Sequence, residues 1–357
     1  MILSSINVQN AVFITMTNYQ WKLSDLRKVE SNGLKVFSTF SCGGGSSMGY
    51  KLAGYELMGN CEIDPEMMAI YKENLNPKHP FLMDIRQFKN LKSYPSELYD
   101  LDVLDGSPPC SVFSTAGLRE DAWGIEKAFK EGQSVQALDD LFFDYLDVVE
   151  RLQPKVFIAE NVTGLIKGSA KGFVRMINEK AKSIGYDVQL FLLNSAKMGV
   201  PQRRERVFFV GRKKSLDIPP LQLTNKFNQK PIPYGDLRSG KGAKLNEHTK
   251  TYRRWLKRKP SDKNFGDITK RVEGKESNFN TILIRNNDVV PTLSSGSGFV
   301  RYDEPYFVSK LDIVQIQSFP MDYNFLDAQP LYVCGMSVPP LMMKGLAEQV
   351  ARQMFKK

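Results

Sequence analysis

The chain of 357 residues is long enough for one large domain or two unequal ones, and its composition, 42% hydrophobic and 25% charged, is that of an ordinary globular protein. Its net charge of +10 favours a polyanionic partner, most often nucleic acid. The chain has four cysteines without a CxxC pair and only two histidines, which argues against a zinc or other metal site and against a disulfide framework. It has no apolar run near the ~18 residues of a membrane span. These features are those expected of a cytoplasmic protein.

Apolar strands and helices alternate from Leu34 onward, after an N-terminal extension of residues 1–33. The pattern predicts strands at 34–40, 54–64, 99–106, 154–161, 186–194 and 206–212, and helices at 65–75, 135–152, 171–184 and about 340–355. This alternation predicts a Rossmann-like, doubly wound α/β fold, in which helices cover both faces of a mostly parallel sheet.

Residues 213–290 have a different composition, rich in Lys, Arg, Asn, Pro and Gly and with weak periodicity. Within them KTYRRWLKRKP (250–260) is a dense basic run with two aromatic residues. A solvated helix face would explain this run taken alone. Inside a basic chain, we interpret the region as a smaller, irregular domain that faces DNA.

The glycine cluster FSCGGGSSMG (40–49) lies where the first strand should turn into a helix, and glycines there would let a cofactor approach the backbone. Glu62 ends the second strand, where a carboxylate can bind a ribose diol. Asp84, in LMDIRQF, lies in the loop expected after the next strand of this half, which precedes the strand at 99–106. Together they indicate an adenosine-containing ligand, either a nicotinamide dinucleotide or S-adenosylmethionine. The spaced GxGxxG that cradles a pyrophosphate is missing, and a cofactor without phosphates would not need it.

Three further motifs lie at the ends of predicted strands. GSPPCS places Cys110 after two prolines, which restrict the direction of its thiol, although a lone cysteine is most often a small buried hydrophobe. AENV places Glu160 at the same sheet edge, where a carboxyl could protonate a ring nitrogen. QRRER places Arg204 and Arg206 two apart, so both side chains share one face of a strand.

FSCGGG, GSPPCS, AENV, QRRER and the late QSFP occur in the order found in the cytosine-C5 DNA methyltransferases, and the chain resembles that family from Leu34 to nearly its end. The resemblance implies the class I methyltransferase fold, S-adenosylmethionine as cofactor and S-adenosylhomocysteine as product. It implies that Cys110 attacks cytosine C6, that Glu160 protonates N3, and that Arg204 and Arg206 hold the base and order the site. The target base must leave the duplex to reach the thiol.

The resemblance also assigns binding residues and domains. The residues expected to bind the cofactor are Phe40, Ser41, Cys42, Gly43, Gly44, Gly45, Glu62, Ile63, Asp84, Ile85, Pro109 and Ser337. The residues expected to bind DNA are Ser111, Ser114, Arg119, Gln202, Arg253, Arg254, Lys257 and Thr292. Residues 34–212 and 295–357 would form the catalytic domain and 213–294 the target-recognition domain. The expected partner is duplex DNA, with a monomeric enzyme in the bacterial cytoplasm; a cognate restriction endonuclease is left open.

Several positions depart from the family pattern, among them Cys42 and Met336. Cys42 stands where F-x-G-x-G has its first glycine, so the backbone there is expected to avoid conformations reserved for glycine. Met336 stands where GNSV has its asparagine. Three alternatives remain: a tRNA-modifying relative, which would lack the basic region; a non-catalytic DNA-binding relative, which would lose Cys110 or Glu160; and a nicotinamide oxidoreductase, which leaves GSPPCS unexplained.

Overall fold

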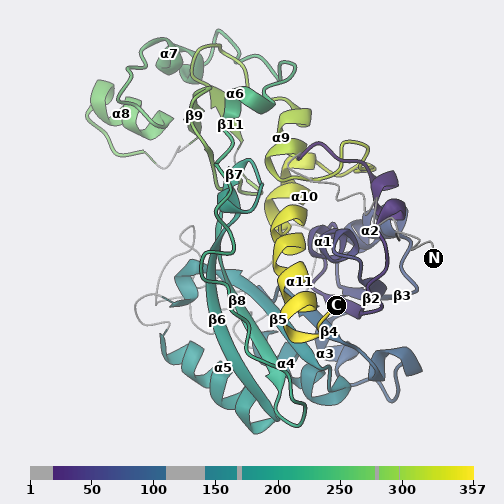
Figure 1. The fold of residues 1–357 in the computed structure, drawn as a ribbon. Helices are drawn as coiled ribbons and strands as arrows, with labels where there is room; N and C mark the ends of the chain where they lie inside the picture. The colour runs from purple at the N-terminus through teal and green to yellow at the C-terminus, as the bar shows by residue number, and fades with distance from the viewer. Residues whose placement is uncertain (1–18, 110–140, 167–170, 278–280, 297) are drawn as a thin grey trace, which may run out of the picture.

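The computed structural model describes residues 19–109, 141–166, 171–277, 281–296 and 298–357. Within these ranges seven strands form one sheet in the order β3-β2-β1-β4-β5-β8-β6 (Figure 1). The strands are β1 (Lys35–Thr39), β2 (Glu56–Glu62), β3 (His79–Leu82), β4 (Val103–Gly106), β5 (Val156–Val162), β6 (Tyr186–Asn194) and β8 (Glu205–Lys213). The first five are parallel, and β8 runs antiparallel to both β5 and β6.

Helices cover both faces of this sheet. Alternate strand residues such as Val36 and Ile158 pack with α1 (Gly45–Leu52), α2 (Pro65–Leu75) and α11 (Pro340–Met354). Their neighbours Phe37 and Phe157 pack on the other face with α3 (Ile85–Phe88), α4 (Leu141–Leu152) and α5 (Lys171–Ser183). The predicted doubly wound, mostly parallel sheet is therefore confirmed.

The basic region forms a smaller lobe, seen above the sheet in Figure 1. Its elements are α6 (Tyr234–Leu237), α7 (Lys250–Leu256), α8 (Phe265–Glu273), β9 (Ile282–Ile284) and β11 (Phe299–Arg301). Its separate hydrophobic core consists of Leu245, Trp255, Phe265, Ile268, Leu283 and Val300. The lobe thus has short regular elements around a core of its own, although weak periodicity predicted an irregular domain.

Contacts at the two ends of residues 213–294 bear on the extent of this lobe. Ile218 and Leu221 are buried in the core of the large sheet. At the other end, Val300 lies in the core of the lobe and Phe307 packs against it. At the neck between lobe and sheet, β7 (Gln202–Arg203) pairs in parallel with β10 (Val290–Pro291).

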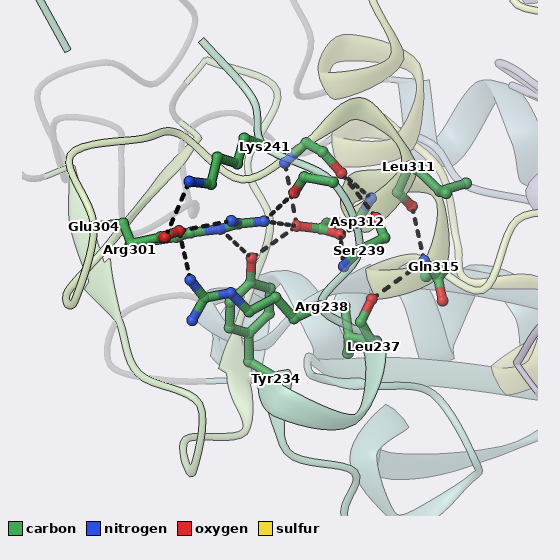
Figure 2. Close-up of polar contacts among 12 residues, drawn as sticks. Tyr234, Leu237, Arg238, Ser239, Lys241, Arg301, Glu304, Leu311, Asp312 and Gln315 are labelled. Atoms are coloured by element: carbon green, nitrogen blue, oxygen red, sulfur yellow. Dashed lines mark hydrogen bonds and ion pairs between the residues drawn. The ribbon is translucent and has the colours of Figure 1, made fainter. Parts of the chain in front are cut away.

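A buried ion pair joins the small lobe to α9 (Lys310–Ile316), as Figure 2 shows. Arg301 and Asp312 are both almost fully buried, with 3.2 Å between Nη2 and Oδ2. Asp312 also accepts hydrogen bonds from Tyr234 Oη at 2.7 Å and from the Ser239 backbone N–H at 2.8 Å. Such a carboxylate needs all these partners, because a buried charge without them is very costly.

The described part of the N-terminal extension is packed against the C-terminal segment. Trp21 is buried, and its indole N–H donates to the Ser318 carbonyl at 2.8 Å. The Met321 backbone N–H in turn donates to the Trp21 carbonyl at 2.8 Å. Residues from Tyr19 onward therefore belong to the folded body.

Candidate active site

The glycine turn between β1 and α1 is shaped by close packing of the chain on itself. A Cβ on Gly43 would lie 2.4 Å from Val333 Cγ1, and one on Gly45 would lie 2.1 Å from the Val338 carbonyl oxygen. Gly44, the N-cap of α1, has φ of 76°. These glycines thus let the start of α1 meet α10 (Pro330–Met336) and the segment after it, which places Ser337 beside the turn.

Cys42 does not avoid the left-handed region, contrary to the expectation from its place in the motif: its φ is +44°. Its backbone N–H donates to Glu62 Oε2 at 2.7 Å, which holds this conformation against an intrinsic cost of about 1–2 kcal/mol. Burial, and after it the charge of Glu62, raises the pKa of the Cys42 thiol to about 12. Cys42 is therefore a neutral thiol at neutral pH and no nucleophile.

Acidic side chains end the second and third strands, as expected. Glu62 Oε1 accepts from the backbone N–H groups of Ile63 at 2.9 Å and Asp64 at 3.0 Å. Burial raises the pKa of Glu62, and these backbone bonds oppose the rise. Asp84 caps α3, which begins with the buried Ile85. Both carboxylates thus lie at the carboxyl edge of neighbouring parallel strands.

The aromatic and hydroxyl groups of the turn lie nearby. Phe40 is half-buried with φ of +51° and packs at the edge of the core beneath α3 and α4. Ser41 Oγ accepts from the buried Asn60 Nδ2 at 2.9 Å. Asn60 was not predicted as a site residue, although its place near the end of β2 was a signal for it.

The ends of β4 and β5 bring the GSPPC and AENV motifs together. Asn161 is buried, and its Nδ2 donates to the Pro108 carbonyl at 3.1 Å. The half-buried Pro109 follows, and Cys110 itself lies outside the described residues. Asn161 was not predicted as a site residue, although it stands beside Glu160 in the motif; it fixes the backbone that leads into Cys110.

Glu160 and Arg206 form an ion pair, with 2.8 Å between Oε1 and Nε. They are brought together by the antiparallel register, in which Glu160 lies opposite Phe208 and Val162 opposite Arg206. Side chains two apart on a strand share a face, so Glu160 and Arg206 reach each other on one side of the sheet. Their low exposure, 11% and 13%, makes the pair stronger than a solvated surface pair.

Arg204 lies in the wall of a cavity of about 670 Å³. Its Nη1 donates to the Leu293 carbonyl at 3.0 Å and its Nη2 to the Gly335 carbonyl at 3.1 Å, while its buried Nε has no hydrogen-bond partner within the described ranges. Burial, followed by the charge of Arg206, lowers the pKa of Arg204 to about 9, so the group stays cationic at neutral pH. The residues lining the cavity are Val162, Thr163, Gly164, Arg203, Arg204, Glu205, Arg206, Pro291, Thr292, Leu293, Ser294, Ser295 and Gly335.

A family model for C-5 cytosine-specific DNA methylases matches residues 34–352 of this chain. The chain belongs to this family. The prediction of the family is thereby confirmed, and the family's reaction is methylation of cytosine C5 in DNA. The family has methyl transfer as its reaction, which implies S-adenosylmethionine.

Curated relatives agree with the family. The type II methyltransferase M.NgoPII of Neisseria gonorrhoeae is 37% identical over 187 residues, which is 52% of this chain and 50% of that protein. The chain thus spans about half of that relative. The type II methyltransferase M1.HphI of Haemophilus parahaemolyticus is 29% identical over 336 residues, 89% of this chain and 87% of that protein.

Solved structures show the same fold. A protein encoded within an Escherichia coli prophage superposes with a TM-score of 0.66 at 18% identity, covering 91% of this chain and 100% of that one. Spodoptera frugiperda DNMT2 gives 0.61 at 15% identity, covering 89% and 99%. Over the described residues, no helix has the length and apolar character for a membrane span, and no group of His, Cys, Asp and Glu is arranged to hold a metal ion.

The residues expected to bind DNA differ in exposure and in position on the chain. Gln202 is completely buried and all its hydrogen-bond partners lie inside the protein, so its side chain is not presented to a duplex. Arg253 and Lys257 are exposed on and just after α7, whereas Arg254 is paired with Glu273 at 2.9 Å. Thr292 lines the cavity. The remaining three, Ser111, Ser114 and Arg119, lie outside the described residues.

Proposed function

We propose that this chain methylates C5 of a cytosine flipped out of duplex DNA, with Cys110 as nucleophile and Glu160 as proton donor. The observation that carries the proposal is the Glu160–Arg206 ion pair beside the cavity. Its Glu160 lies on β5, which is next to β4, the strand that leads into Cys110. The Asn161–Pro108 hydrogen bond supports it, because it joins these two strand ends directly. The volume of the cavity suits one small-molecule-sized group such as a base.

The residues act on the ring in a balanced sequence. The Cys110 thiolate forms a bond to C6 while N3 accepts a proton from Glu160, and the ring becomes an enamine. When bound, S-adenosylmethionine would supply the methyl group, which C5 accepts as S-adenosylhomocysteine leaves. A base then removes the C5 proton, the C6–S bond breaks so that Cys110 leaves as thiolate, and N3 returns its proton to Glu160. Arg206 orients the Glu160 carboxyl throughout, and Arg204 lends positive charge to the cavity wall.

The chemistry of the described groups fits this cofactor. Carboxylates at the ends of β2 and β3 suit the hydroxyl and amino donors of adenosine, and the half-buried ring of Phe40 suits a base. Glu62 and Asp84 would hold the ribose and adenine. Ser337 and the backbone at Gly43–Gly45 would lie near the amino-acid part. S-adenosylmethionine has no phosphate, so the glycine turn does not have to bind one.

The small lobe is proposed to read the DNA, as the domain division at 213–294 supposes, with its core continuing through residue 307. Exposed Arg253 and Lys257 would contact phosphates. Arg254, already neutralised by Glu273, would contribute less. The same proposal includes a monomeric enzyme in the cytoplasm, and sedimentation would test whether it is a monomer. A cognate endonuclease would be sought by restriction challenge of unmethylated DNA.

Methyl transfer from tritiated S-adenosylmethionine to unmethylated plasmid DNA tests the proposal, followed by methylome sequencing of the host to identify the site. Wild-type protein should label duplex DNA, and Cys110→Ala should abolish labelling. Duplex with 5-fluorocytosine at the site should form a covalent adduct, because fluorine blocks loss of the C5 proton. An adduct with tRNA and none with DNA would favour the tRNA-modifying alternative, and no labelling of either would favour the non-catalytic one.

A further inference from the structure

Two buried glutamines connect the cavity wall to the cofactor side of the molecule. Gln202 Oε1 accepts from the Leu293 backbone N–H at 2.8 Å, and its Nε2 donates to Gln317 Oε1 at 2.5 Å and to the Ile316 carbonyl at 3.3 Å. Gln317 Nε2 then donates to the Ser337 carbonyl at 2.6 Å. Both glutamine residues have no exposed surface. We call Leu293–Gln202–Gln317–Ser337 the amide relay.

The direction of the amide relay is fixed by its ends. A backbone N–H can only donate, so Leu293 requires the oxygen of the Gln202 amide, and the Gln202 nitrogen must face Gln317. A carbonyl can only accept, so Ser337 requires the nitrogen of the Gln317 amide. Each of the two side-chain amides therefore has a single orientation, with its oxygen and nitrogen positions set by its partners.

Each end of the amide relay belongs to one of the two proposed binding sites. Leu293 lines the cavity, and its carbonyl accepts from Arg204. Ser337 adjoins the glycine turn: a Cβ on Gly45 would lie 3.0 Å from Ser337 Cβ. Arg204 makes a second tie in the same direction through the Gly335 carbonyl. These contacts connect the cavity wall to the segment beside the glycine turn.

We propose that Gln317 is a positioning residue that couples the target-base cavity to the cofactor site, so that occupation of one site strengthens binding at the other. This rests on the proposed function. Buried amides in an unbroken network hold one geometry, because any other leaves a buried donor or acceptor unpaired. The cofactor and the base would each stabilise that geometry, which is the requirement for positive coupling.

Binding measurements with S-adenosylhomocysteine test this directly, without turnover. Calorimetry gives its Kd, and fluorescence anisotropy gives the Kd of a duplex containing the methylation site, with and without saturating S-adenosylhomocysteine. For wild-type protein we expect the product to tighten DNA binding by a factor of roughly five or more. Gln317→Met, of similar volume but without the amide, should reduce this factor to about one and weaken S-adenosylhomocysteine binding.

Gln315→Met is the matched control. Gln315 is almost equally buried at the end of the same helix, but its Nε2 donates to the Leu237 carbonyl in the small lobe at 3.3 Å and has no bond to the amide relay. The variant should lower thermal stability and keep the coupling factor and the S-adenosylhomocysteine Kd. If Gln317→Met does not fold, Gln317→Asn keeps an amide that is one methylene too short to bridge both partners.

The outcomes separate the two proposals. If both Gln317 variants keep the wild-type coupling factor, or lose only stability as Gln315→Met does, the positioning role is overturned. If wild-type protein binds S-adenosylhomocysteine but labels no DNA and shows no methylation site, the proposed function fails instead. Loss of coupling in Gln317→Met with wild-type coupling in Gln315→Met supports the inference.

Discussion

Replacing Asp105 by asparagine should make the protein more stable above neutral pH. Asp105 lies on β4 with 2% of its surface exposed, and its Oδ1 accepts from Ser46 Oγ at 3.4 Å and Tyr50 Oη at 3.3 Å. Burial raises the pKa of Asp105 from 3.8 to about 7; nearby hydroxyl groups oppose this and the charge of Glu160 adds to it. The carboxyl is thus protonated in the folded protein below about pH 7.

The magnitude follows from proton linkage. In the unfolded chain Asp105 ionises near its ordinary value of 3.8, so between about pH 4 and 7 the folded state keeps a proton that the unfolded state has lost. The free energy of unfolding therefore falls as the pH rises through this window, by about 1.4 kcal/mol per pH unit. From pH 5 to pH 7 the loss is about 2 kcal/mol, because the slope has halved when the pH reaches the folded pKa of about 7. The asparagine side chain of the variant does not titrate in this range, so the variant escapes this loss.

Urea unfolding followed by far-UV circular dichroism at pH 5, 6, 7 and 8 measures the effect as the difference between Asp105→Asn and wild type. The difference should move in favour of the variant by about 2 kcal/mol between pH 5 and pH 7 and level off above pH 7. Asp217→Asn, which removes a carboxylate from the surface, controls for net charge. A difference between Asp105→Asn and wild type that stays constant from pH 5 to pH 8 would refute the reasoning.

Three further results are expected. Asp312→Asn should destabilise the protein by about 3–5 kcal/mol at pH 7. Burial raises the pKa of Asp312, but its hydrogen bonds outweigh burial and hold the pKa below 3.8. The stability difference between variant and wild type should therefore shrink in thermal melts below about pH 4. Cys42→Val should be less stable than Cys42→Gly by about 1–2 kcal/mol in urea unfolding, because a branched side chain suits φ of +44° poorly. Glu160→Gln should lower kcat by about 10²–10⁴-fold in the tritium assay while calorimetry shows unchanged S-adenosylhomocysteine binding; equal loss of both would contradict its role as proton donor.

Sequence patterns predicted the bounds of those elements whose ends are set by residues next to them in the chain. Helix α2 begins and ends where expected, at residues 65 and 75, because Asp64 accepts from the first backbone N–H groups and Pro65 occupies the first position. β4 is shorter than the predicted 99–106 and begins at Val103, because residues Ser96–Tyr99 form a 3-10 turn. An alternating apolar pattern does not distinguish a strand from the turn that leads into it.

The polar interior could not be predicted in this way. Gln202 and Gln317 are 115 residues apart and meet only because the chain returns to the neck after completing the small lobe. In the sequence Gln202 begins a charged run, which is typical of a surface, and only the pairing of β7 with β10 buries it. The Glu160–Arg206 pair, in contrast, was foreseeable. Both residues lie on strands that the sequence predicts, and the alternation of side chains along a strand places each of them on a definite face.

The buried partners of Asp312 limit how target specificity can be exchanged between relatives. Asp312 belongs to α9 of the large body, whereas Arg301, Tyr234 and Ser239 come from the small lobe. A chimera that grafts a foreign recognition lobe onto this catalytic body must bring equivalents of these partners, or the graft junction will contain an unpaired buried carboxylate. Compatible donors can therefore be chosen by inspecting a few junction residues, whatever DNA sequence the donor lobe reads.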